Sequence, residues 1–125
     1  MSISLAKAQP FSGMDGFNSP EEWGAWTSER IAELELPKAV RGNVSVEFFG
    51  WVLPENDNKL LTISLGNSSQ DILLKTVGES YTVHLSVSCL SNRLRFEIPV
   101  VRPSTSSRFM GVAISSVKIS LQSGK

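Results

Sequence analysis

Apolar and polar residues alternate along most of the chain. In residues 31–37, for example, Ala32, Leu34 and Leu36 alternate with Glu33 and Glu35. A period of two predicts a β-strand that buries one face and leaves the other in water. Similar stretches occur at residues 43–53, 59–66, 80–88, 92–99 and 115–122. Their predicted inward residues are Val44, Val46, Phe48, Leu61, Ile63, Leu65, Tyr81, Val83, Leu85, Val87, Leu94, Phe96, Ile98, Val117, Ile119 and Leu121.

Turn-forming residues separate these stretches. They occupy residues 54–58, 66–69, 77–80 and 90–92, and a longer polar loop covers 102–107. Their Asn, Asp, Gly, Pro and Ser residues favour tight turns. No stretch keeps a helical period, but a single helical turn is expected at residues 20–23, where Ser19 can cap it and Pro20 can begin it. Seven or more short strands at this spacing predict an all-β, antiparallel β-sandwich, with a closed barrel as the alternative.

Length and charge narrow the classes of protein. The 125 residues suit one domain, so we expect a single β-sandwich over 1–125 with an ordered core from about residue 11 to residue 121. Lys and Arg number 12, as do Asp and Glu, so no strong positive field is available to attract nucleic acid. No window is apolar enough to span a bilayer. We therefore expect no nucleic-acid partner and no membrane insertion of this chain.

Catalytic and metal-binding motifs are missing from the sequence. It contains no P-loop, GxGxxG, GxSxG or HExxH. His84, the only histidine, falls on the polar face of a predicted strand, and Cys89, the only cysteine, is expected to be a small buried residue. Residues 55–58 offer oxygen ligands without the spacing of a calcium loop, which favours a plain turn. We therefore expect no enzyme, no cofactor and no metal site.

The stretch EEWGAWTSER at residues 21–30 is the most distinctive in the chain. It places Trp23 and Trp26 around a glycine, with Glu21 before them, and Trp51 lies outside the alternating apolar set of its own strand. Indole faces pack against the C–H groups of sugar rings while polar neighbours bond the hydroxyls. Tryptophan also buries much apolar area in small cores. Both interpretations, core packing and ligand contact, stay open on the residues alone.

The same stretch carries a family resemblance. Residues 16–37 resemble the opening of a domain of unknown function found at the C-terminus of certain bacterial membrane glycosyltransferases and phosphoglycerol transferases. A second match lies near the end of the chain, and the resemblance covers about residues 11–121. The matching residues are Gly16, Glu21, Trp23, Gly24, Trp26, Thr27, Leu36, Pro37, Ile98, Pro99, Arg108, Met110, Gly111, Val112 and Ala113.

The resemblance implies a jelly-roll sandwich similar to galactose-binding-like domains, and a link to envelope or exopolysaccharide glycans. It does not imply catalysis, because in such proteins the reaction belongs to another part of the chain. One position departs from the pattern: the family often has an acid where this chain has Ser106. Arg108 then needs another partner, for which Glu21 and Glu22 are the candidates.

Together these features predict a non-catalytic accessory module that binds or positions an oligo- or polysaccharide. The expected ligand-binding residues are Glu21, Trp23, Trp26, Trp51 and Arg108. The alternative is a structural or protein-interaction module, such as a homodimer, and a small enzyme relying on His84 ranks third. A complete protein of this length would stay in the cytoplasm, whereas a module cut from a membrane transferase would be periplasmic or membrane-associated.

Overall fold

The protein is built from antiparallel strands. A computed structural model describes residues 1–6, 13–99, 101–103 and 109–121. The strands are β1 (Ser2–Ser4), β2 (Met14–Asp15), β3 (Ala25–Trp26), β4 (Ile31–Val52), β5 (Leu60–Leu65), β6 (Ser68–Leu73), β7 (Glu79–Glu97), β8 (Arg102–Pro103), β9 (Phe109–Met110) and β10 (Val112–Leu121), with one short 3-10 helix, Pro54–Asn56. No helix of this described part is long and apolar enough to cross a membrane.

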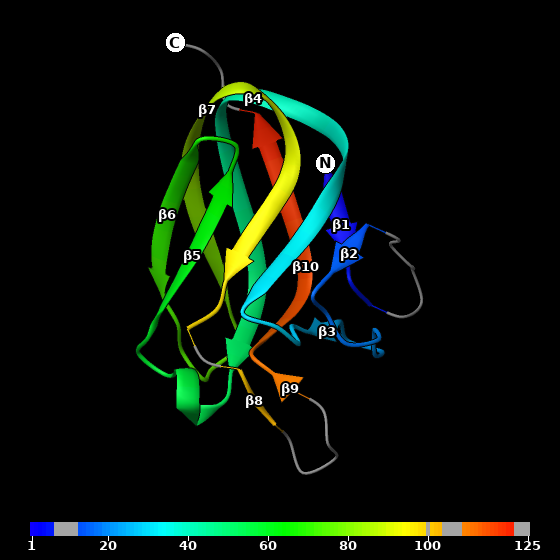
Figure 1. Ribbon diagram of the computed structural model, residues 1–125, viewed down its shortest axis with the longest axis vertical. Coiled ribbons are helices and arrows are strands. Elements are labelled where there is room, and N and C mark those ends of the chain that lie inside the picture. The colour runs from blue at the N-terminus through cyan, green and yellow to red at the C-terminus, as the bar shows by residue number, and fades with distance from the viewer. Residues whose placement is uncertain (7–12, 100, 104–108, 122–125) are drawn as a thin grey trace.

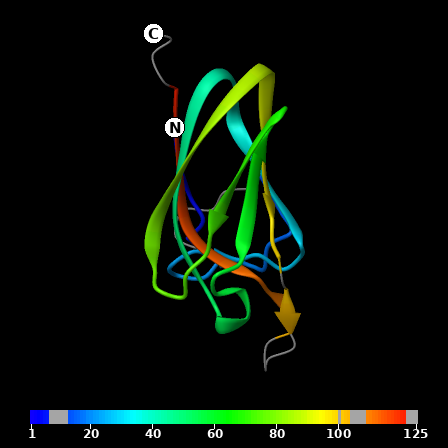
Figure 2. The same ribbon diagram turned by 90° about the vertical axis from the view of Figure 1, so that its left-hand side faces the viewer.

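Two long strands, β4 and β7, define the architecture. They pair with each other at both ends, from Ile31 opposite Glu97 to Gly50 opposite Glu79. Both strands turn over at one end of the molecule, so each contributes one half to each of two facing layers (Figures 1 and 2). The expected antiparallel β-sandwich is therefore confirmed, and its two layers are joined by continuous strands.

Each layer has its own set of neighbours. In layer 1, β10 pairs with the second half of β4 and carries β1 and β3 on its other side. In layer 2, β2 pairs with the first half of β4, while β5 pairs with the second half of β7 and carries β6 at the edge. The pair β8 and β9 forms a separate two-stranded ribbon.

The corner between the layers changes the register of the long strands. Glu35 pairs with Arg93 and Gly42 with Val87, so β4 uses one residue more than β7 between these two points. An extra residue on one strand is the signature of a β-bulge, which bends a strand and increases its twist. As a result, the inward residues of β7 change from odd to even numbers across the corner, while those of β4 stay even.

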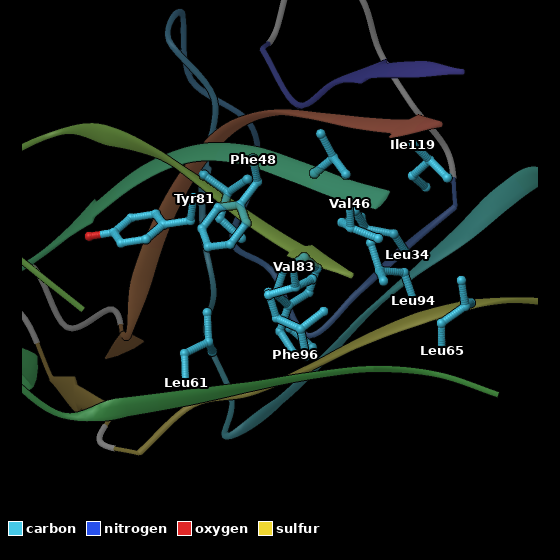
Figure 3. Close-up of a cluster of buried hydrophobic side chains, with 14 of the residues drawn as sticks. Leu34, Val46, Phe48, Leu61, Leu65, Tyr81, Val83, Leu94, Phe96 and Ile119 are labelled. Carbon is cyan, nitrogen blue, oxygen red and sulfur yellow. The ribbon is translucent and has the colours of Figure 1, made fainter. Parts of the chain in front are cut away.

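The core lies between the layers and consists of the alternating apolar residues. Figure 3 shows Val46, Phe48 and Val83 of layer 1 pointing towards Leu61 and Phe96 of layer 2. Every predicted inward residue is buried except Leu121, the last residue of β10, which is 62% exposed. The core also includes Ile3 and Leu5, which precede residue 11, where we expect the ordered core to begin.

Three local predictions are wrong. Residues 90–92 do not form a turn but belong to β7, because this is where that strand bends between the layers. Cys89 is exposed in the same bend, since its side chain points away from the core. Residues 20–23 contain no helical turn, and the 3-10 helix begins instead at Pro54.

One edge of layer 1 is closed by side chains of β6 and of the turn that precedes it. The backbone N–H groups of residues 84, 86 and 88, on β7, donate to side-chain oxygens at distances of 3.0, 3.0 and 2.9 Å. An edge strand otherwise presents such groups to other chains. We call these three acceptors the polar clasp; they are Gln70, Ser68 and Asn67.

Candidate functional site

The stretch that contains two of the tryptophans crosses one end of the sandwich. It leaves layer 2 after β2 and reaches layer 1 at β3, which pairs with β10. A tight turn shapes it, because the backbone N–H of Glu21 donates to the carbonyl of Gly24 at 2.6 Å, and the reverse bond measures 3.3 Å. The N–H of Asn18 donates to the carbonyl of Trp26 at 2.8 Å, and this bond joins the part of the segment before the turn to the part after it.

Gly24 is required by the contact of this segment with β10. Its φ of +152° lies in a region that favours glycine, and an added Cβ would lie 2.4 Å from the carbonyl oxygen of Ile114. It would also lie 2.6 Å from the Cα of Ser115, where β10 has a bulge. This glycine therefore allows the segment to lie directly against the backbone of β10.

Thr27 fixes the end of the segment. It is fully buried, its Oγ1 accepts the N–H of Val112 at 2.9 Å, and its own N–H donates to the carbonyl of Val112 at 2.9 Å. Gly111 donates its N–H to the Thr27 carbonyl at 3.0 Å. A Cβ on Gly111 would lie 2.5 Å from the Thr27 Oγ1, so glycine is what lets this hydroxyl reach the backbone.

Trp26 and Trp51 lie in one row across layer 1, with Ala113 of β10 between them in register. Successive residues of a strand face opposite sides, and the neighbours Ala25, Val52 and Val112 all belong to the core. The row therefore faces away from the core. Trp26 is only 7% exposed, yet it lies outside the core cluster, so it packs on the outer face instead of anchoring the interior.

The small side chain of Ala113 allows the two indoles to meet. Strands two positions apart are separated by about 9.5 Å, but the ring centroids of Trp26 and Trp51 are 6.4 Å apart, at an interplanar angle of 81°. The rings thus lean towards each other above Ala113, which is fully buried although it lies on the outer face.

Trp23 completes the cluster from the crossing segment. Its ring centroid lies 4.8 Å from that of Trp51 and 5.9 Å from that of Trp26, the latter in an edge-to-face arrangement. Such pairs contribute about 0.5–1.5 kcal/mol beyond their buried area. Trp23 and Trp51 are half-buried and Trp26 is buried, so two of the three indoles keep part of their surface in solvent.

Phe49 extends the cluster along β4. It lies two residues before Trp51 on the same face, its ring centroid is 6.3 Å from that of Trp51, and it is 38% exposed. The loop before β7 passes close to both rings, since a Cβ on Gly78 would lie 3.2 Å from Phe49 and 3.6 Å from Trp51. We call Trp23, Trp26, Trp51 and Phe49 the aromatic row.

A polar hollow of about 290 Å³ continues from Phe49 on the same face. Ser2, Ser80 and Ser116 contribute hydroxyls to its lining. Glu47 and Lys118 contribute opposite charges; they are cross-strand partners but form no ion pair in the described part of the chain. We call this the outer hollow. Its hydroxyl, carboxylate and ammonium groups can donate and accept hydrogen bonds beside an aromatic surface.

The predicted site residues are partly brought together. The three tryptophans Trp23, Trp26 and Trp51 form one cluster, and Glu21 lies in the turn that precedes Trp23. Arg108 lies outside the described residues. No group of three or more His, Cys, Asp or Glu residues that could hold a metal ion occurs within the described ranges.

Sequence reasoning missed Phe49 and the outer hollow. A signal for Phe49 was present: Phe49 and Trp51 are apolar residues two apart on the face of the strand that alternation assigns to water. The outer hollow gave no comparable signal, because Ser2, Ser80 and Ser116 come from three different strands and meet only through the register of layer 1.

The fold and the site define an all-β, two-layer antiparallel sandwich with an aromatic row on one outer face. The sequence model of a family described as a domain of unknown function (DUF7024) matches residues 5–123, and the chain belongs to this family. No curated protein and no solved structure matches the chain.

Proposed function

We propose that the protein is a non-catalytic module that binds or positions glycan on the outer face of layer 1. The observation that carries the proposal is the aromatic row beside the outer hollow. Trp23, Trp51 and Phe49 each keep part of their surface in solvent, and hydroxyl and charged groups lie next to Phe49 in the outer hollow.

This combination suits the two kinds of surface on a sugar. The C–H groups of a pyranose face pack against an aromatic ring, and this contact discriminates little between sugars. Hydroxyl groups at the ring edge need directed partners, which Ser80, Ser116, Glu47 and Lys118 can supply as donors and acceptors. An extended chain of sugar units could then lie along the row and place one unit over the outer hollow.

The family resemblance supports a setting for this activity. It suggests that the module accompanies membrane glycosyltransferases or phosphoglycerol transferases of bacterial envelope or exopolysaccharide biosynthesis, with a galactose-binding-like jelly roll as its fold type. In this proposal the reaction belongs to the transferase, and the module holds the glycan near it. Such a module would be periplasmic or membrane-associated.

A titration with bacterial polysaccharides and their oligosaccharides tests the proposal. Binding is followed by tryptophan fluorescence, because three indoles lie in the row, and by calorimetry, which stays informative in tryptophan variants. We expect Trp23→Ala to weaken binding at least tenfold. Phe109→Ala is the matched control, because Phe109 is an aromatic residue that is 52% exposed outside the row. No response of the wild-type protein at millimolar sugar would refute the proposal.

A second candidate function, protein interaction, is favoured by one apolar pair. Leu60 and Leu73 are cross-strand partners at the edge of layer 2, with 53% and 45% of their surfaces exposed. Paired exposed leucines are typical of a contact surface. Light scattering, together with the glycan titration, separates the two functions. Protein interaction would be supported in place of glycan binding if the wild type is a homodimer, Leu60→Ser is a monomer, and the protein binds none of the glycans.

A further inference from the structure

A second hollow, of about 370 Å³, lies on the outer face of layer 2. Its size falls within the range of small-molecule sites, about 300–1,000 Å³. Charged and hydroxyl or amide side chains dominate its lining, and none of the described residues that line it is aromatic. We call it the arginine hollow; its polar and charged side chains are Glu33, Ser64, Ser91, Asn92, Arg93 and Arg95.

The hollow exists because β5 ends before its neighbour does. Ser64 pairs with Arg95, and Leu65, the last residue of β5, pairs with Leu94. The chain then turns away at Gly66, with φ +61°, while β7 continues alongside. A Cβ on Gly66 would lie 2.5 Å from the Oγ of Ser91, so the turn lies close against β7, and Gly66 and Ser91 both line the hollow.

The charges in the hollow do not cancel. The Nη1 of Arg93 forms an ion pair of 3.0 Å with the Oε1 of Glu33. Arg95 pairs in register with Glu33 and with Ser64, but its guanidinium makes no ion pair or hydrogen bond with any described residue. The described lining therefore carries one positive charge in excess, and the guanidinium of Arg95 offers a fork of donors, suited to a carboxylate, that no described residue occupies.

We infer that the arginine hollow binds the carboxylate group of an acidic monosaccharide unit, with Arg95 as its main anchor. The single excess charge matches one carboxylate, whereas a phosphate monoester carries about −1.5 to −2 at neutral pH and would also face Glu33. Ser64, Ser91 and Asn92 offer hydroxyl and amide groups to the sugar hydroxyls. Recognition here rests on charge and hydrogen bonds, because the described lining residues are charged, hydroxyl-bearing or amide-bearing and offer no ring for stacking.

This inference does not depend on glycan binding at the aromatic row, which lies on the other layer. The direct test is a titration of the ¹⁵N-labelled protein with sodium glucuronate, followed by two-dimensional NMR at constant ionic strength. We expect saturable shifts at the amides of Ser64, Gly66, Asn92 and Arg95. Glucose, which has the same ring without the carboxylate, is expected to produce no saturable shifts there, and inorganic phosphate is expected to bind more weakly than glucuronate.

Variants identify the anchor. Arg95→Gln should weaken glucuronate binding at least tenfold, and Arg95→Lys should weaken it less, because it keeps the charge but loses the fork. Arg41→Gln is the matched control, since Arg41 is another exposed arginine of the same sheet outside the lining. The shifts at the amides of Ser64, Gly66, Asn92 and Arg95 report on this hollow, which separates it from the aromatic row on the other layer.

Three results would overturn the inference. The first is glucuronate binding to Arg95→Gln with wild-type affinity in a protein whose NMR spectrum shows an intact fold. The second is an equal response to glucose, which would mean that the carboxylate is irrelevant. The third is phosphate binding as tight as that of glucuronate at the same amides, which would assign the hollow to phosphate instead of to an acidic sugar.

Discussion

Replacing Gly24 by alanine tests how the crossing segment is held on layer 1. Two separate penalties act at this position. A side chain at φ +152° is strained, at a cost of about 1–3 kcal/mol. The added Cβ would also overlap the Ile114 carbonyl oxygen at 2.4 Å and the Ser115 Cα at 2.6 Å, so the backbone of the segment or of β10 must shift. Forcing extra volume into a packed site costs a further amount of about 1–3 kcal/mol.

Gly42 provides the control that separates these penalties. It has a φ of +101°, so alanine there is strained as well, but nothing lies within 4 Å of the position its Cβ would take. Gly42→Ala should therefore report the strain alone. We expect Gly24→Ala to lower the free energy of unfolding by about 1–3 kcal/mol more than Gly42→Ala does.

Urea denaturation measures the difference. With a slope of about 2 kcal/mol per molar urea, the midpoint of Gly24→Ala should lie roughly 0.5–1.5 M below that of Gly42→Ala. The tryptophan emission of folded Gly24→Ala should also change, because Trp23 and Trp26 flank the substitution and their packing on Trp51 depends on the position of the segment. Emission of folded Gly42→Ala should match the wild type.

Equal midpoints for the two variants would refute this reasoning, because they would mean that the contact between Gly24 and β10 imposes no steric limit. A lower midpoint with unchanged emission would preserve the steric argument. It would, however, contradict the claim that this contact positions the indoles.

Further predictions concern the cluster, the buried hydroxyl groups and the clasp. Trp26→Ala should lower the free energy of unfolding by about 3–5 kcal/mol, measured by urea denaturation, and more than Trp23→Ala, because only Trp26 is buried. Thr27→Val should cost about 1–3 kcal/mol in the same assay, since the buried N–H of Val112 loses its acceptor at similar side-chain volume. Burial raises the pKa of Tyr81 in the folded protein, so its hydroxyl ionises at a lower pH in the unfolded chain. The free energy of unfolding should therefore be unaffected below about pH 10 and should fall as the pH rises above that value. Melting temperatures measured over this pH range should fall less for Tyr81→Phe than for the wild type. Replacing all three side chains of the polar clasp by alanine should expose the β7 edge and produce association visible by light scattering, which single replacements at other exposed positions of β6 should not.

The sequence predicts the core well because burial in a two-layer sandwich follows a period of two. Leu34, Val46, Val83 and Phe96 are all where alternation places them. Leu121 is the exception, since it is the last residue of its strand and has 62% of its surface exposed. Alternation predicts the face of the strand on which a side chain lies. It predicts burial less well at the end of a strand, where neither layer covers the side chain.

Alternation does not show how strands continue. Most corner residues of β4 and β7 are exposed and several are polar, so they resemble turns in composition, although the two strands still pair there at Val40 and Ser91. Cys89 illustrates the consequence: its neighbours predict burial, but the bend at the corner directs its side chain outward. Alternation also fails to predict the edge strand β6, whose residues are mostly polar. Polar side chains of β6 and of the turn before it bond the backbone of β7, and strand propensity does not describe such a tertiary contact.

The tryptophans show why two interpretations of one stretch can both describe part of the molecule. Core packing and ligand contact are alternatives only if each indole must do one or the other. Trp26 is buried, yet on the outer face, where it fixes the edge on which Trp23 and Trp51 keep exposed surface. A rigid, partly exposed aromatic surface loses little freedom when a sugar packs on it. Burial of Trp26 therefore supports the proposed glycan site and does not compete with it, and the link between them is Ala113, a small residue that no single-strand pattern would select.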